Sequence, residues 1–318
     1  MSSLVVNTNV ASMNAQRSLM ASSKELQSAM ERLSSGKKIN SAADDAAGFA
    51  IAESMTAQVR GLSMSAKNAN DALGLLKVVE NATNDVTDML QRIRELAVQA
   101  QSGTNSTGDI ANLQLEAEAL MDEIIRVSED TTYNGKAYIG GDAGSINIQV
   151  GYNDGDVIAV TTYDINASKL GYELTAADTG LGTEAAATAA ALQSLVTIDT
   201  SGAVTSYLDI SRTNVAKVTT SGSEADRIPG ALEVISAAID QVASYKAEWG
   251  AGQNRLQYTV SNLMNVVEFT TAARSRIQDA DFAVEAARLA KAQVLQQTGT
   301  AMLAQANAAP QLALQLLK

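Results

Sequence analysis

The sequence contains no cysteine and no histidine, and each absence excludes a class of chemistry. A chain without cysteine forms no disulfide and offers neither a thiol nucleophile nor a thiolate ligand for a metal ion. A chain without histidine lacks the most common general base and the most common ligand for transition metals. A hydrolase that uses only carboxylates remains an alternative, but no spaced acidic pair in a loop supports it. We therefore predict that the protein is not an enzyme, has no catalytic or metal-binding residue and needs no cofactor.

Aromatic residues, prolines and long apolar runs are also scarce. Aromatic residues make up 4% of the chain, whereas 46% of it is hydrophobic, mostly alanine, leucine and valine. Such a mixture favours helices packed along a narrow seam over a globule built around aromatic rings. Only Pro229 and Pro310 are prolines that could interrupt a helix. No stretch reaches the roughly 18 apolar residues that span a bilayer, and the first residues lack the basic segment and apolar core of a cleaved secretory signal.

The net charge of −12 argues against nucleic acid or an anionic membrane as the main partner, so we predict no nucleic-acid binding and no membrane insertion. The excess of acidic residues lies between residues 61 and 278, and both ends of the chain are nearly neutral. Neutral, apolar ends are suited to burial against copies of the same chain. Because a single chain offers these ends no partner, we expect them to be disordered in the monomer and to fold on assembly.

Two distant parts of the chain carry apolar residues at steps of three and four, which is the pattern of a coiled-coil seam. The first seam comprises Leu76, Val79, Thr83, Val86, Leu90, Ile93, Ala97 and Ala100, and the second comprises Leu232, Ile235, Ile239, Val242, Leu256, Val260, Leu263 and Val267. Because matching seams can pack together, we predict a mainly α fold, a long antiparallel coiled-coil or helical-bundle rod formed by the N- and C-terminal segments. The pattern alone also fits any antiparallel helical bundle, or the signalling rod of a chemoreceptor, which would require membrane spans.

Capping residues and breaks in the pattern set the expected boundaries. The expected helices cover residues 11–35, about 41–101, about 110–127, 229–277 and 281–307. Gly36 is the expected C-cap of the first helix, and Ser41 is the expected N-cap of the second, with Asp44 in capping-box position. Pro310 is expected to lie just beyond the end of the last helix.

The middle of the chain has a different pattern. Apolar and polar residues alternate between residues 144 and 162, around a turn at Asn153-Asp154-Gly155, which predicts a β-hairpin. Residues 177–225 have little pattern and predict a small irregular outer insertion, with one short helix near 184–195. The aromatic residues expected in the core are Phe49, Trp249 and Phe282.

Seven blocks, in order along nearly the whole chain, together resemble bacterial flagellin. The blocks are SSGKKINSAADDAAGFAIAE, QRIRELAVQAQSGTNS, EIIRVSEDTTYNGK, IQVGYNDGD, GAGQNRLQYTVSNL, ARSRIQDADFA and QQTGTAMLAQANAAPQLALQLLK. Flagellins are the repeating subunits of the flagellar filament, so the resemblance implies a structural protein whose copies form a helical polymer for motility. The related hook–filament junction protein is an alternative, but the long matches at both ends favour the filament subunit.

The resemblance also implies domains, partners and a location. Residues 1–42 and 279–318 would form the inner tube of terminal helices, residues 43–176 and 226–278 the helical rod with its hairpin, and residues 177–225 the outer insertion. The implied partners are other copies of the chain, an export chaperone, the cap protein and hook-associated proteins. The subunit would be exported unfolded by the flagellar type III apparatus to the extracellular filament, without a cleaved signal peptide.

Three groups of residues have roles implied by the resemblance. The residues expected to pack in the filament core are Leu19, Leu26, Leu33, Leu289, Leu295 and Leu303. The positions that match the motif read by a host Toll-like receptor are Gln91, Arg92, Leu96 and Glu116. The C-terminal leucines that match those read by a host inflammasome sensor are Leu314, Leu316 and Leu317.

Overall fold

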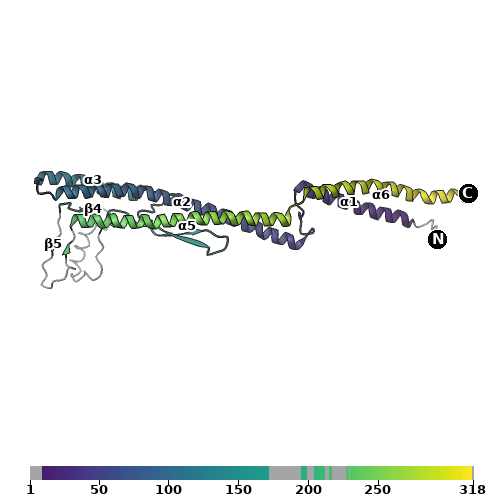
Figure 1. Cartoon of the computed structure of the whole chain (residues 1–318), viewed down its shortest axis with the longest axis horizontal. Coiled ribbons are helices and arrows are strands. Elements are labelled where there is room, and N and C mark those ends of the chain that lie inside the picture. The colour runs from purple at the N-terminus through teal and green to yellow at the C-terminus, as the bar shows by residue number, and fades with distance from the viewer. Residues whose placement is uncertain are drawn as a thin grey trace. The chain divides into compact units, whose positions relative to one another are not determined.

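The computed structural model describes residues 9–171, 195–198, 204–211, 215–216, 227–228 and 230–316. The helices in these residues are α1 (Val10–Ser35), α2 (Ala46–Ala100), α3 (Thr107–Asp130), α5 (Ala231–Gln278) and α6 (Phe282–Leu316) (Figure 1). The chain divides into two compact units. The first unit comprises Met1–Gly61 and Asn265–Lys318, and the second unit comprises Leu62–Met264. The predicted mainly α fold is confirmed.

Local capping explains where α1 and α3 end and begin. Gly36 follows α1 with a φ of +70°, a left-handed conformation that glycine adopts without strain, so the predicted C-cap is confirmed. Helix α3 begins with a complete capping box. The Ser106 side chain accepts the backbone N–H of Asp109 at 3.2 Å, and the Asp109 carboxylate accepts the backbone N–H of Ser106 at 3.0 Å.

Helix α2 begins at Ala46, so the prediction that Ser41 is its N-cap is wrong. Asp45 caps the helix instead, because its Oδ1 accepts two first-turn N–H groups at 3.0 and 3.1 Å. Asp44 closes the preceding turn, where its Oδ2 accepts the N–H of Ser41 at 3.0 Å. The hydrogen bond from the Ser41 backbone lowers the pKa of the Asp44 carboxyl below its usual value. The two adjacent aspartates thus serve two different turns.

Helix α6 continues to Leu316, so the prediction that it ends at residue 307 is wrong. Pro310 removes one N–H donor and costs about 3 kcal/mol in a helix interior, but the residues after it still have N–H groups that can continue the helix. At the other end of α6, Phe282 is 59% exposed, which corrects its expected place in the core. Glu285, rather than the aromatic residue, is the buried side chain of that first turn.

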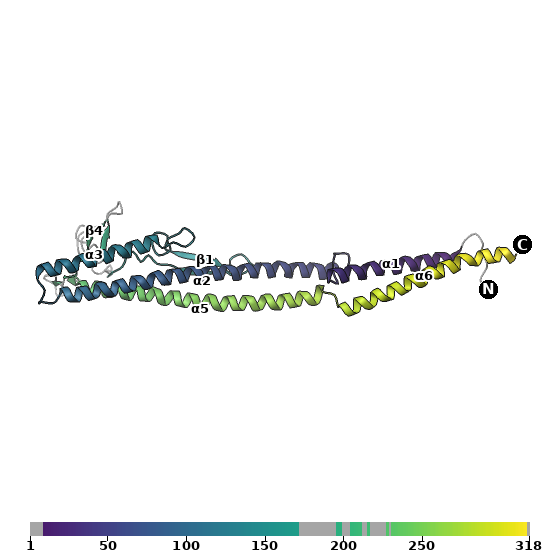
Figure 2. The ribbon, with the colours of Figure 1, turned by 90° about the horizontal axis from the view of Figure 1, so that it is seen from above.

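The core of the second unit is formed by the two predicted seams. Figures 1 and 2 show α3 and α5 lying alongside α2 in this unit. Every residue of the first seam is buried, from Leu76 to Ala100, and so are Ile235, Val242, Leu256 and Leu263 of the second. Thr83 is tolerated inside this seam because its hydroxyl donates to the Val79 carbonyl one turn earlier, at 2.7 Å. The seam prediction is therefore confirmed within the second unit.

The predicted hairpin consists of β1 (Ser145–Gln149) and β2 (Val157–Thr161), paired antiparallel from Ser145 opposite Thr161 to Gln149 opposite Val157. Side chains of β2 alternate, so that Ile158 and Val160 are buried against the helices. The indole Nε1 of Trp249, 2% exposed on α5, donates to the Thr161 carbonyl at 2.9 Å. Trp249 is therefore a core residue, as predicted, and it also attaches the hairpin to α5.

The predicted insertion at 177–225 is only partly within the described residues. Within it, β3 (Val196–Ile198) pairs with β4 (Val204–Tyr207), and β5 (Val215–Ala216) pairs with β6 (Arg227–Ile228), which lies just beyond residue 225. The segment beside β4 attaches to α3, because Gln114 donates to the Leu208 carbonyl at 3.1 Å and accepts the Ile210 N–H at 3.1 Å. Of the short helix predicted near 184–195, only Leu195 is described, and the other positions lie outside the described residues.

Candidate functional site

The terminal helices α1 and α6 form an antiparallel pair within the first unit (Figure 2). Polar contacts hold the pair at the end near residue 9. There, the side chain of Asn9 donates to the Ala306 carbonyl, and the hydroxyl of Ser12 donates to Asn307 Oδ1, both at 2.8 Å. These contacts fix which turn of α6 lies opposite which turn of α1.

A second group of contacts holds the other end of the pair. The N–H of Lys38 donates to the Gln278 carbonyl at 2.7 Å, and the N–H of Ala280 donates to the Gly36 carbonyl at 3.0 Å. Beside them, Arg32 and Glu285 form an ion pair between α1 and α6. The helix pair is therefore secured by polar groups at both ends.

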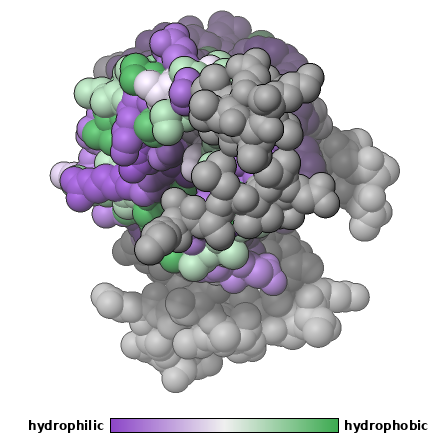
Figure 3. All heavy atoms as spheres, turned by 90° about the vertical axis from the view of Figure 1, so that its right-hand side faces the viewer, coloured by the Kyte–Doolittle hydropathy of each residue, from purple (hydrophilic) through white to green (hydrophobic). Residues whose placement is uncertain are grey.

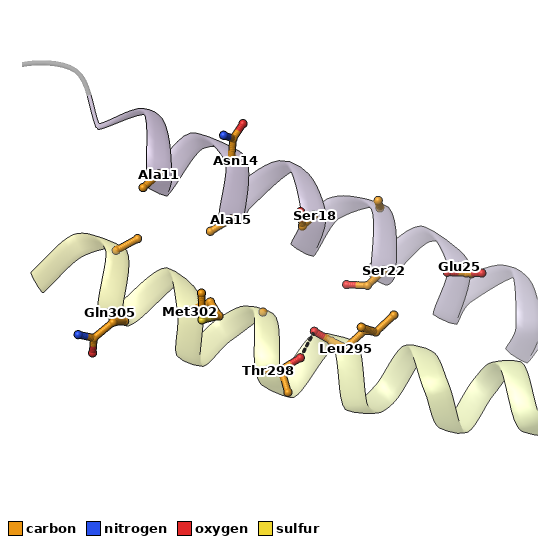
Figure 4. Close-up of a pocket in the computed structure, with 13 residues that line it drawn as sticks. Ala11, Asn14, Ala15, Ser18, Ser22, Glu25, Leu295, Thr298, Met302 and Gln305 are labelled. Carbon is orange, nitrogen blue, oxygen red and sulfur yellow. Dashed lines mark hydrogen bonds between the residues drawn. The ribbon is translucent and has the colours of Figure 1, made fainter. Parts of the chain in front are cut away.

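Between these ends lies a groove of about 740 Å³ (Figure 4). Small residues dominate its lining, which includes Ala11, Ala15, Ser18, Ala21, Ser22, Thr298, Gly299 and Ala306. In Figure 4, Met302 and Leu295 point from α6 toward α1, whereas Gln305 points away. The absence of a side chain at Gly299 lets the helices approach closely, because a Cβ there would lie 3.3 Å from Leu19 Cδ1. Two helices lined in this way leave space between them that a further apolar side chain can fill.

The six leucines predicted to pack at the terminal helices are not fully buried in the single chain. Leu19, Leu26, Leu33, Leu289 and Leu303 are half-buried, and Leu295 is 42% exposed. Further apolar side chains on α1 and α6 are exposed: Val10, Met13, Met20, Met30, Val284, Val294 and Met302. The space-filling view shows apolar and polar side chains intermixed on the coloured part of the face that it draws (Figure 3). Because exposed and half-buried apolar side chains gather on two paired helices, this helix pair is a candidate interaction surface.

The structure brings together three of the four residues matched to the receptor motif, and it separates the fourth from the surface. Gln91 and Arg92 on α2 and Glu116 on α3 are exposed. The Nε and Nη2 of Arg92 both donate to Glu116 Oε1, at 2.9 and 2.8 Å, and these hydrogen bonds to one carboxylate oxygen raise the pKa of the guanidinium above its usual value. Leu96 is 1% exposed and packs inside the second unit, so it cannot contact a partner directly.

The C-terminal leucines lie at the limit of the described residues. Leu314 and Leu316 belong to α6, but their side chains are outside the description, and Leu317 lies beyond the described residues. In the described ranges no three acidic side chains come together as a possible metal site, and no helix there is long and apolar enough to cross a membrane.

The ion pair between Arg32 and the buried carboxylate of Glu285 was not predicted from the sequence. One signal for it was present, because Glu285 and Arg288 are three residues apart on a helix that is otherwise nearly uncharged. That spacing indicates a surface pair, however, and only the packing of α1 on α6 reveals that the carboxylate is buried.

Comparison with known proteins places these features in a family. Residues 6–142 match the bacterial flagellin N-terminal helical region, and residues 232–317 match the bacterial flagellin C-terminal helical region. The chain is 39% identical to flagellin of Bacillus subtilis (strain 168), over 98% of this chain and 99% of that protein. It is 35% identical to flagellin A of Vibrio anguillarum, over 99% of this chain and 100% of that protein.

Among solved structures, the crystal structure of Bacillus cereus flagellin matches with a TM-score of 0.40 and 21% identity, over 62% of this chain and 88% of that one. The identification depends on the sequence matches, which extend over both terminal helices, the α2 and α5 seams and the hairpin. The chain belongs to the bacterial flagellin family.

Proposed function

We propose that this chain is the self-assembling subunit of a bacterial flagellar filament and that its terminal helix pair is the main surface of assembly. The observation that carries the proposal is the uncovered apolar surface of α1 and α6, together with the groove between them. In this proposal, residues 1–42 and 279–318 form the inner tube, residues 43–176 and 226–278 form the rod, and residues 177–225 lie outermost. Contacts of this kind between copies do not close into a ring, so they propagate a helical polymer.

The energetics of the terminal helices support assembly-coupled folding. Ordering a residue costs roughly 1–2 kcal/mol of backbone entropy, and half-buried leucines in a single helix pair offset only part of that cost. Neighbouring copies would cover the exposed methionines and valines, at about 25 cal/mol per Å² of apolar surface. We therefore expect residues 11–35 and 281–307 to exchange their amide hydrogens rapidly in the monomer and slowly in the filament. Strong protection of both segments in the monomer would contradict this.

Polymerisation of the purified protein tests the proposal. The protein is warmed with short filament seeds, assembly is followed by light scattering, and the product is viewed by electron microscopy. Long filaments are expected. If the purified protein stays monomeric at high concentration, the proposal is wrong. If it forms only short assemblies on filament ends, the hook–filament junction alternative is favoured.

The same proposal includes export and extracellular assembly. A subunit that is secreted unfolded through the flagellar type III apparatus would need an export chaperone to cover its apolar ends and a cap protein to fold it at the tip. The exposed apolar side chains of α1 and α6 support such a need. Culture medium from cells with and without a functional export apparatus tests it, because only the former should contain the full-length chain.

We also propose that the monomer is recognised by host innate immune receptors. Gln91, Arg92 and Glu116 would form the contact surface for a Toll-like receptor, and Leu314, Leu316 and Leu317 would be read by an inflammasome sensor. The exposed ion pair of Arg92 with Glu116 supports the first assignment, whereas buried Leu96 would act only through packing.

A receptor reporter assay with monomeric protein tests the contact surface. Arg92→Ala should lower reporter output by roughly tenfold, the effect of one charge-assisted hydrogen bond at an interface. Leu96→Ala is the matched comparison. Its reporter output should fall only as far as the folded fraction of the second unit falls, which circular dichroism measures. Unchanged output from Arg92→Ala would contradict the assignment.

A further inference from the structure

A tight turn joins Tyr133 to Lys136 on the surface of the second unit. The backbones of these two residues exchange hydrogen bonds of 2.9 and 3.2 Å, so Asn134 and Gly135 form the loop between them. The φ values of the loop residues are +52° and +79°, a left-handed conformation that asparagine and glycine tolerate best. The geometry of the turn therefore favours asparagine followed by glycine, in which no side chain hinders attack of the glycine nitrogen on the asparagine amide.

Both reacting groups of this loop are free. The Asn134 side chain and the Gly135 N–H make no hydrogen bond with any residue that the structure describes, and both residues are exposed. A Cβ added to Gly135 would meet no atom within 4 Å, so water reaches the backbone there. The nitrogen of Gly135 is bonded to the carbonyl carbon of Asn134. It can therefore close a succinimide ring on Asn134 Cγ through rotation within the turn alone.

A second asparagine in a loop of the same unit, Asn105, precedes the small residue Ser106, but there both groups are held. The side-chain amide of Asn105 donates to the Gln99 carbonyl. The N–H of Ser106 donates to Asp109 Oδ2 at 3.0 Å, as part of the capping box that begins α3. This nitrogen would have to leave a charge-assisted hydrogen bond before it could attack. The structure thus protects Asn105 and leaves Asn134 unprotected.

We propose that Asn134 is a site of spontaneous deamidation, at which the folded chain converts its own asparagine to aspartate and isoaspartate. Solvent hydroxide removes the proton of the Gly135 N–H, and the nitrogen attacks Asn134 Cγ. The new C–N bond replaces the bond to the side-chain nitrogen, which takes a proton from water and leaves as ammonia. Water then opens the succinimide at either carbonyl. The net reaction consumes water and releases ammonia, so no other co-reactant is needed.

The modification changes the turn in two ways. It adds a negative charge, and the isoaspartate form adds a backbone atom to the loop, so the paired hydrogen bonds between Tyr133 and Lys136 lose their present geometry. The hydroxyl of Tyr133 donates to the Asp71 carbonyl at 3.2 Å, which attaches the turn to α2. Deamidation should therefore loosen this attachment as the chain ages. The site lies within the second unit, so the proposal does not rest on the proposed function.

Ageing of the purified monomer, native and in denaturant, tests the site. Trypsin places the two asparagines in different peptides because it cleaves after Arg126, and mass spectrometry measures the gain in mass at each. An isoaspartate-specific methyltransferase with a labelled methyl donor measures isoaspartate in the Asn134 peptide. We expect both signals to accumulate at Asn134 in the native protein, faster in weakly alkaline than in neutral buffer. Folding should slow Asn105 about tenfold more than it slows Asn134, because a charge-assisted hydrogen bond must break first.

Two variants sharpen the test. Asp109→Ala frees the Ser106 N–H, so it should raise the native rate at Asn105 severalfold and leave the rate at Asn134 unchanged. Glu129→Ala is the matched control, because it removes the same charge from an exposed position on the same helix, and both rates should stay as in the wild type. The proposal is wrong if Asn134 stays unmodified in the native protein, if folding slows both sites equally, or if Asp109→Ala leaves the rate at Asn105 unchanged.

Discussion

The second unit and the terminal helix pair of the first unit are built from the same kind of sequence, yet they bury it to different extents. Along α2, the seam from Leu76 to Ala100 is buried throughout, because α3, α5 and the hairpin belong to the same core. Along α1 and α6, five of the six leucines are only half-buried and Leu295 is exposed, because only two helices share them. A heptad pattern therefore predicts which residues face a partner, but it does not tell whether that partner belongs to the same chain.

The largest effect should come from a cavity inside the second unit. Leu90→Ala removes a completely buried side chain, so it should lower the free energy of unfolding by about 3 kcal/mol. Chemical denaturation followed by circular dichroism measures the change. Leu115→Ala is the control, because Leu115 lies on α3 with most of its side chain exposed, and it should change stability by less than about 0.5 kcal/mol. Equal losses from the two variants would mean that the seam is not the core.

The opposite pattern is expected for the terminal helices. Leu26→Ala truncates a half-buried leucine of α1, so the denaturation midpoint of the monomer should change little, while the critical concentration for polymerisation should rise by roughly tenfold. Light scattering at a series of protein concentrations gives that value. A variant that destabilises the monomer but assembles normally would show that α1 completes its packing within the single chain.

A smaller loss is expected where one hydrogen bond connects the hairpin to α5. Trp249→Phe removes the Nε1 donor and leaves the Thr161 carbonyl without it, which should cost about 1–2 kcal/mol. Hydrogen exchange should increase in β2 more than in α3. Tyr258→Phe is the matched control, because Tyr258 lies on the same helix and is strongly exposed. If both substitutions have the same effect, the bond does not hold the hairpin.

The sequence was sufficient to predict elements defined by repetition and by local capping. The seams, the helix ending at Gly36 and the alternating hairpin depend on residues that are close together in the chain, so their signals are complete in the sequence. Pro310 illustrates the opposite case. Its local signal is to end a helix, but the helix continues because the remaining N–H groups can still bond.

The candidate site was predicted only in part, because it depends on which helices meet. The sequence correctly predicts that α1 and α6 are helices, but it gives no indication that Glu285 is buried against Arg32, which lies 253 positions earlier in the chain. Leu96 and Arg92 occupy one short motif, yet one is inside the second unit and the other is exposed. The start of α2 was predicted wrongly because Asp44 and Asp45 accept hydrogen bonds in two different turns. The spacing of the residues alone does not show which aspartate belongs to which turn.

The smallest predicted effect concerns a titration at the edge of the second unit, where β4 approaches α3. The hydroxyl of Tyr207 donates to Asp122 Oδ1 at 2.7 Å, which raises the pKa of Tyr207 from its usual value of 10.0 to about 12. Because the folded pKa is the higher one, the contribution to stability is fully present below the unfolded pKa and is lost as the pH rises through the folded value. Spectrophotometric titration of the native protein should therefore show a late tyrosine phase, which Tyr207→Phe reduces and Asp122→Asn moves to lower pH. Tyr163 also titrates late, since its hydroxyl donates to Glu248, so part of the phase should survive in both variants. A phase that is unchanged in both would show that β4 is not attached to α3 through this bond.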